Sequence, residues 1–112
     1  MVEQQPEHLD SVFHALADPT RRQMLRSLAL QERTVSELAG PFHMSLAAAS
    51  KHVKTLERAG LVQRTIQGRT HLCRLDPKPL AEASGWLRYY ERFWTQSLDA
   101  LEALFPNPDK EQ

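Results

Sequence analysis

Cysteine is almost missing from this chain, and long apolar runs are missing altogether. The 112 residues include one cysteine, Cys73, so no internal disulfide can form. No apolar stretch approaches the ~18 residues of a membrane-spanning helix. The first ten residues, MVEQQPEHLD, lack the basic and then apolar layout of a signal peptide. We therefore expect one globular domain over residues 1–112, located in the reducing cytoplasm and without a membrane partner.

The net charge of the chain is zero, but the charges are unevenly distributed along it. Residues 41–76 carry six Lys and Arg against two acidic residues, a net charge of +4. The segments 1–40 and 77–112 each carry a net charge of −2. A local excess of positive charge is what a phosphate-binding surface needs, although an ordinary patchy surface gives the same counts.

Apolar spacing and capping signals predict three helices in the first third of the chain. The first two are expected over residues 7–17 and 19–29. A third, short helix should span residues 34–39, opened by a capping box in which Thr34 and Glu37 satisfy each other's backbone donors. Gly40 and Pro41 then stop the helix, and a tight turn follows.

The middle of the chain predicts a longer helix and a hairpin. The helix begins after the N-cap Ser45 and ends at Ala59, with Gly60 in the left-handed conformation. Strands at 61–66 and 70–75 then pair around a glycine turn. A short helix, a turn, a second helix and a hairpin form a winged helix-turn-helix.

One long helix closes the predicted fold. It covers residues 79–105 and is followed by a polar tail at 106–112. The expected fold class is mainly α with a small β-hairpin wing, arranged as four helices, two strands and a fifth helix. Residues 7–76 form the helices and wing, and residues 77–105 form a C-terminal dimerisation helix.

The helix after Ser45 has two distinct faces when it is wound at 100° per residue. The face expected to meet the core carries Leu46, Ala49, Val53 and Leu56. The opposite face carries Ala47, Lys51, Thr55 and Arg58, with Ala48 and Lys54 on its shoulders, so small residues lie in the first turn and cations further along. Short side chains near base edges and cations near phosphates suit a helix that enters the DNA major groove. An ordinary solvated helix can carry the same residues.

The hairpin strengthens the DNA-binding interpretation. Arg64, Gln67 and Arg69 surround the Gly68 turn. A hairpin tip beside a docked helix reaches the neighbouring DNA backbone or minor groove, where the two arginines can contact phosphates. Helix and hairpin together predict a double-stranded DNA partner.

Three segments carry a family resemblance: FHALADPTRRQMLRSL, TVSELA and SLAAASKHVKTLERAGLVQRTIQGRTHLCRLD. They resemble the ArsR/SmtB family of bacterial winged-helix repressors, over about residues 9–105. The resemblance implies a homodimer joined through the first and last helices, binding to an inverted repeat, and repression that a signal relieves. It also implies a set of DNA-binding residues: Ser45, Ala47, Ala48, Ser50, Lys51, His52, Lys54, Arg64, Gln67, Gly68 and Arg69.

Many members of that family sense metals, but this sequence does not have the residues that bind the metal in them. Such sensors hold paired cysteines on the third helix, or His and acidic ligands on the last. Here the third helix reads TVSELAG and the last has no histidine. We expect no metal and no other cofactor, and we expect Cys73 to be a small buried residue. One arrangement stays open, in which His8 and His14 meet across a dimer seam.

The last helix is apolar over more than one face. Six of the eight aromatic residues lie between Trp86 and Phe105. A surface this wide suits a dimer, which would hold two recognition helices one DNA turn, ~34 Å, apart. The predicted dimer interface consists of Leu9, Val12, Phe13, Leu16, Trp86, Tyr90, Phe93, Trp94, Leu98 and Leu101. Two alternatives remain: burial in a single core, and a pocket for an unknown apolar effector lined by Trp86, Tyr90 and Trp94.

Catalysis finds no support in the sequence. There is no Gly-rich phosphate loop and no nucleophile elbow. The predicted function is a sequence-specific DNA-binding transcriptional regulator, a homodimeric repressor acting at an inverted repeat. The alternative is a winged-helix protein-interaction module without DNA binding.

Overall fold

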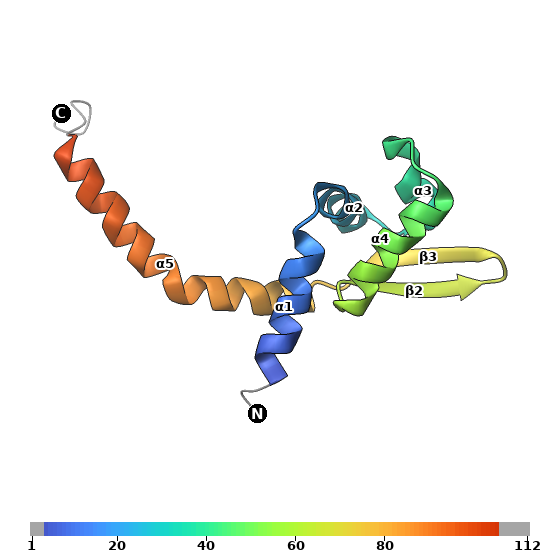
Figure 1. The fold of residues 1–112 in the computed structure, drawn as a ribbon, viewed down its shortest axis with the longest axis horizontal. Coiled ribbons are helices and arrows are strands. Elements are labelled where there is room, and N and C mark those ends of the chain that lie inside the picture. Colours follow the sequence, from blue (N-terminus) through green and yellow to red (C-terminus); the bar gives the residue numbers. More distant parts are fainter. Residues whose placement is uncertain (1–3, 106–112) are drawn as a thin grey trace.

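A computed structural model describes residues 4–105 of the chain, with side chains from His8 onwards. The elements follow one another as α1 (Gln4–Leu16), α2 (Pro19–Leu30), β1 (Arg33–Thr34), α3 (Val35–Ala39), the 3-10 helix η1 (Gly40–Phe42), α4 (Leu46–Arg58), β2 (Val62–Gln67), β3 (Thr70–Leu75) and α5 (Lys78–Leu104). Figure 1 shows α4 beside the β2–β3 hairpin. The predicted fold class, a mainly helical winged helix-turn-helix, is confirmed. The predicted tail at 106–112 lies outside the described residues.

One strand was not predicted. The sheet has three antiparallel strands in the order β1-β3-β2. Arg33 lies opposite Cys73 and Thr34 opposite Leu72, so β1 ties the wing to the connection between α2 and α3. Two residues are too few to show the period-2 alternation that identifies a strand in a sequence.

Capping residues set the ends of the two helices of the helix-turn-helix. The Thr34 hydroxyl accepts the Glu37 backbone N–H at 3.1 Å, and the Glu37 carboxylate accepts the Thr34 N–H at 2.8 Å. This capping box confirms the prediction and lowers the pKa of Glu37, chiefly through the backbone hydrogen bond from Thr34. The Ser45 hydroxyl accepts the Ala48 N–H at 3.0 Å and opens α4. Gly60 closes the other end with a φ of 78°.

The helix α3 ends at Ala39 as predicted, but Gly40 and Pro41 do not break the helical path. Both belong to η1, and Gly40 has ordinary right-handed helical angles. The left-handed residue of this connection is His43, with a φ of 53°. A non-glycine residue in this region is uncommon, and here it redirects the chain into α4.

The core lies where α1, α2, α3 and α4 meet the base of the wing. Its fully buried larger side chains are Val12, Met24, Val53, Leu56, Leu61 and Cys73. The prediction that Cys73 is buried is confirmed, and desolvation raises the pKa of its thiol. The prediction that Leu46 faces the core is wrong, because its side chain is 56% exposed in the first turn of α4.

The helix α5 extends away from the rest of the molecule (Figure 1). The overall dimensions are 63 × 39 × 20 Å and the radius of gyration is 19.1 Å, against about 13 Å for a compact chain of roughly 100 residues. Only Pro79 and Ala83 of α5 are buried. Trp86 contacts Phe13 of α1 edge to face, with ring centroids 5.7 Å apart. No helix among the described residues is long and apolar enough to cross a membrane.

Candidate nucleic-acid interface

The outward side of α4 carries cations that form no ion pair or hydrogen bond with the described part of the chain. Lys51 and Lys54 are exposed, and neither ammonium group has a hydrogen-bond or ion-pair partner among residues 8–105. In the first turn of the helix, Ala47 is exposed and Ala48 is half-buried. Free ammonium groups beside small residues leave this side open to an anionic partner.

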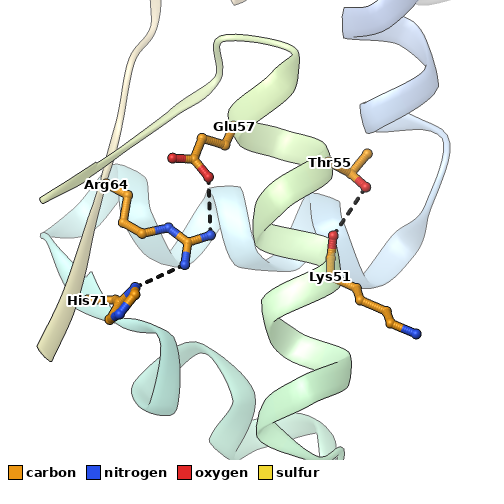
Figure 2. Close-up of polar contacts among 5 residues, drawn as sticks. All are labelled: Lys51, Thr55, Glu57, Arg64 and His71. Carbon is orange, nitrogen blue, oxygen red and sulfur yellow. Dashed lines mark hydrogen bonds and ion pairs between the residues drawn. The ribbon is translucent and has the colours of Figure 1, made fainter. Parts of the chain in front are cut away.

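The Thr55 hydroxyl is hydrogen-bonded within α4 and does not engage the lysine ammonium groups. It donates to the Lys51 carbonyl oxygen at 3.2 Å (Figure 2). The same view shows the Lys51 side chain running away from Arg64 and Glu57. The ammonium of Lys51 therefore stays available for an external partner.

The wing tip is a two-residue turn. Gln67 pairs with Thr70, so Gly68 and Arg69 form the loop between β2 and β3. Gly68 has a φ of 63°, whereas Arg69 does not have a positive φ. Positive φ at the first loop position alone is the pattern of a type II′ turn, which favours glycine there. The turn leaves Arg69 exposed, and its guanidinium has no hydrogen-bond or ion-pair partner among the described residues.

Arg64 does not lie at the wing tip, and its predicted place there is wrong. Its side chain is 10% exposed and points toward α4 (Figure 2). One Nη donates to the Glu57 carboxylate at 3.1 Å, and the other lies 3.1 Å from Nδ1 of His71. Arg64 therefore joins the recognition helix to both strands of the wing.

The register of the hairpin contains the signal for this inward position. Arg64 lies directly opposite Cys73, and directly opposed residues of an antiparallel pair share one face. The sequence already indicated that Cys73 is buried, so Arg64 had to point inward as well. Because both Arg64 Nη groups are donors, Nδ1 of His71 must accept, and a neutral His71 ring then carries its proton on Nε2.

The two arginines of the segment ADPTRR (residues 17–22, here called the ADPTRR box) close the end of α1. Arg21 Nε donates to the Ala15 carbonyl at 2.8 Å and Nη2 to the His14 carbonyl at 3.0 Å. Arg22 donates to the Leu16 carbonyl at 2.7 Å. The Ala15 and Leu16 carbonyls lie in the last turn of α1, where the helix leaves them without donors. The His14 carbonyl also accepts the Ala17 backbone N–H at 3.1 Å. The box thus fixes the corner between α1 and α2.

His52 lies on the side of α4 that faces this corner. Its Nδ1 is 3.3 Å from Nη1 of Arg21, and the residue is half-buried. Asp18 caps α2 by accepting the Arg21 backbone N–H at 3.0 Å. That hydrogen bond, helped by the charges of Arg21 and His52, lowers the pKa of Asp18. His52 thus connects α4 to the α1–α2 corner, rather than projecting from the outward side with Lys51.

A hollow of about 440 Å³ separates the first turn of α4 from the wing. Ser50 and Leu46 line it from α4, Ser36 from α3, and Arg69 and Thr70 from the wing. Ser45 is exposed, with its hydroxyl engaged in the cap of α4. The structure thus brings Ser50 and Arg69 to one hollow, although the sequence places them on separate elements.

No metal-binding cluster occurs among the described residues. Nowhere between residues 8 and 105 do three His, Cys, Asp or Glu side chains converge as metal ligands would. His8 pairs with Glu82 of α5, with Nε2 2.9 Å from the carboxylate. The histidine of the predicted seam is therefore already engaged within the protomer, while His14 is exposed.

The predicted dimer residues fall into three groups. Those on α5 are exposed along one side: Trp86, Tyr90, Phe93, Trp94, Leu98 and Leu101. Leu9, Phe13 and Leu16 of α1 are half-buried against the core. Val12 is fully buried inside the protomer, so its assignment to an interface is wrong. Tyr89 was overlooked, although it is 61% exposed and contacts Tyr90 with ring centroids 4.9 Å apart.

Comparison with known sequences identifies regulators. The profile described as "Bacterial regulatory protein, arsR family" matches residues 18–64. The HTH-type transcriptional regulator Rv2034 of Mycobacterium tuberculosis is 39% identical over 95 residues, which cover 85% of this chain and 86% of that protein. The transcriptional repressor SdpR of Bacillus subtilis is 28% identical over 79 residues, covering 70% and 88% of the two chains.

Solved structures give the same answer. The ArsR family transcriptional regulator RHA00566 is 41% identical, with a TM-score of 0.76 over 80% of this chain and 93% of its own. The homodimeric winged helix-turn-helix DNA-binding domain Mb0332 of Mycobacterium bovis is 27% identical, with a TM-score of 0.64 over 80% and 83% of the two chains. With its ADPTRR box, helix-turn-helix and wing, this chain belongs to the ArsR family of bacterial transcriptional regulators.

Proposed function

We propose that this protein is a cytoplasmic, homodimeric repressor that binds an inverted-repeat operator through α4 and the wing. The observation that carries the proposal is the set of exposed cations on these two elements, Lys51, Lys54 and Arg69, without acidic partners in the described part of the chain. Free cations beside a helix with small residues in its first turn suit phosphates and base edges of a major groove.

The homodimer is supported by the exposed apolar side of α5. Trp86 and Trp94 are 46% and 48% exposed, which is unfavourable for such large side chains in a lone protomer. A second copy that covers this side would also place two α4 helices for the halves of a two-fold DNA site. The relative Mb0332 is described as homodimeric.

A dimer bound to its operator would act as a repressor by blocking access to that DNA. A protein bound across an operator excludes other proteins from the same stretch of duplex, and the relative SdpR is described as a repressor. The protein acts by binding, not by catalysis. In the alternative use of the α5 surface, an apolar effector would bind beside Trp86, Tyr90 and Trp94 and relieve repression. The protein-interaction module is less well supported, because the relatives are transcriptional regulators.

The test is fluorescence anisotropy of the purified protein on duplexes from its own upstream region, titrated with salt. We expect tight binding to a palindrome, with affinity falling steeply as salt rises because phosphate contacts release counterions. Lys51→Ala and Arg69→Ala should each weaken binding and reduce the salt slope by about one. Arg88→Ala, a cation of α5, is the matched control and should change neither.

Two results would contradict the proposal. Absence of specific binding at every salt concentration would favour the protein-interaction module. Binding that is unchanged in Lys51→Ala and Arg69→Ala would place the DNA surface elsewhere. Repeating the titration with EDTA and with added zinc tests the expectation that no metal takes part, since a metal-free repressor responds to neither.

A further inference from the structure

We propose that the hollow between α4 and the wing seats one phosphodiester of the DNA backbone. It would hold the phosphate by the hydroxyls of Ser36, Ser50 and Thr70 together with Arg69. This inference rests on the proposed function and adds residues to it, because Ser36 and Thr70 were not among the predicted DNA-binding residues.

The position of the hollow is the first argument. A helix in the major groove and a hairpin at the adjacent minor groove must straddle the sugar-phosphate strand that separates the two grooves. The hollow lies between these two elements, lined by Ser50 from α4 and by Arg69 and Thr70 from the wing. Ser36 of α3 lines it as well. The strand between the grooves would thus pass the hollow.

The second argument is that the hollow offers free donors from three separate elements. The side chains of Ser36, Ser50, Arg69 and Thr70 make no hydrogen bond within residues 8–105. Arg69 is always charged, and each hydroxyl can donate to a phosphate oxygen. Donors that line one hollow without internal partners are available to an anion.

Charge around the hollow supports an anion over any other ligand. None of the described residues that line it is acidic. The nearby carboxylate of Glu57 is already paired with Arg64, which itself lines the hollow. Nε of Arg64 is buried and has no hydrogen-bond partner among the described residues. His71 contributes a further donor on Nε2 when its ring is neutral.

Leu46 gives the third argument. It lines the hollow and is 56% exposed, although the sequence pattern assigns it to the core. A deoxyribose next to the seated phosphate presents an apolar edge, and contact with Leu46 would remove both from water. A backbone strand in the hollow therefore accounts for an exposed leucine beside a ring of donors.

The experiment uses a duplex selected for binding from a random pool, with single phosphates replaced by neutral methylphosphonates. In the wild-type protein, replacement at one phosphate per half-site should weaken binding about tenfold, as expected for a hydrogen bond to a charged group. The double variant Ser50→Ala/Thr70→Val should bind the unmodified duplex about tenfold more weakly, and that replacement should reduce its affinity less than that of wild type, because only Arg69 and Ser36 still meet the phosphate. Ser84→Ala/Thr95→Val on α5 is the matched control and should behave like wild type.

The outcomes separate this inference from the proposed function. If the double variant binds as wild type and shows the same methylphosphonate profile, the hollow is not a phosphate seat, while DNA binding itself stands. If no duplex is selected, both fall. Inorganic phosphate at constant ionic strength tests the remaining source of anions. Saturable shifts of the Ser50 and Thr70 amide signals without DNA, at phosphate concentrations that leave DNA affinity unchanged, would assign the hollow to a free anion and overturn the backbone proposal.

Discussion

The body of the molecule, which comprises α1 to α4 and the strands β1 to β3, carries large apolar side chains, as does the outer part of α5. These side chains are buried in the body and exposed on α5. In the body, Met24 and Leu56 are fully buried. On α5 beyond Ala83, Trp94 and Leu98 remain 48% and 60% exposed. Both regions are amphipathic helices with an apolar side. The body supplies its own opposing surface, whereas the outer part of α5 is short of one.

This difference separates two kinds of stability. The body closes over its core within one chain, so its unfolding depends on intramolecular packing. The apolar side of α5 needs a second surface, so its contribution depends on protein concentration. Substitutions in the two regions should therefore appear in different measurements.

Leu56→Ala should have the largest effect on the body. Leu56 is fully buried, and truncating such a leucine typically lowers the free energy of unfolding by about 2–5 kcal/mol. Leu101→Ala on α5, where the side chain is 52% exposed, is the matched control. Urea unfolding at low protein concentration should show a large loss for Leu56→Ala and little change for Leu101→Ala. Equal losses would mean that α5 is packed within the protomer.

Trp94→Ala should have the next largest effect, on assembly. Aromatic residues at interface centres commonly contribute about 2 kcal/mol or more, which corresponds to a dimer at least roughly 30-fold weaker. Analytical ultracentrifugation over a range of concentrations should show this shift, while the far-UV circular dichroism of the body stays unchanged. Gln96→Ala, on the polar side of the same helix, should leave the dimer constant near that of wild type. An unchanged constant for Trp94→Ala would move the interface away from α5.

Arg64→Ala tests whether the polar contacts of the body, like its core, are formed within one chain. The side chain is 10% exposed and joins Glu57 to His71, so its loss should lower stability by about 1–2 kcal/mol, between values for exposed and buried pairs. DNA affinity should fall because the wing is no longer held against α4, yet the salt slope should stay the same. Arg64→Lys should recover only part of the affinity, since one ammonium cannot span both partners. A slope reduced as in Arg69→Ala would instead make Arg64 a direct phosphate contact.

Most of the fold was predictable from short-range chemistry. The capping box at Thr34, the cap at Ser45 and the left-handed Gly60 each depend on a few neighbouring residues, and each appears as predicted. The strand β1 was not predictable in the same way. Its two residues are defined by pairing with β3, more than 35 positions along the chain.

The errors in the site have one common cause. Leu46, Val12 and Arg64 were assigned from their own helix or turn, but their environment depends on which neighbouring element lies beside them. Leu46 lies past the edge of the core, Val12 lies inside it, and Arg64 is drawn inward by Glu57 and His71. For Arg64 the predicted strands at 61–66 and 70–75 would pair it with Leu72, whereas the two-residue turn of the structure places it opposite Cys73.

Asp18→Asn should have the smallest effect and should be confined to the body. Asparagine keeps the cap of α2 but removes a negative charge at the helix N-terminus, which is worth about 0.3–1 kcal/mol. Because the pKa of Asp18 is lowered in the folded protein, its ionised form adds stability above the unfolded pKa. That contribution disappears as the pH falls through the folded pKa, below about pH 4. Urea unfolding should therefore separate wild type from Asp18→Asn at pH 7 and bring the two together in acid, without moving the dimer constant. A gap that widened in acid would mean that the charge of Asp18 is unfavourable in the fold.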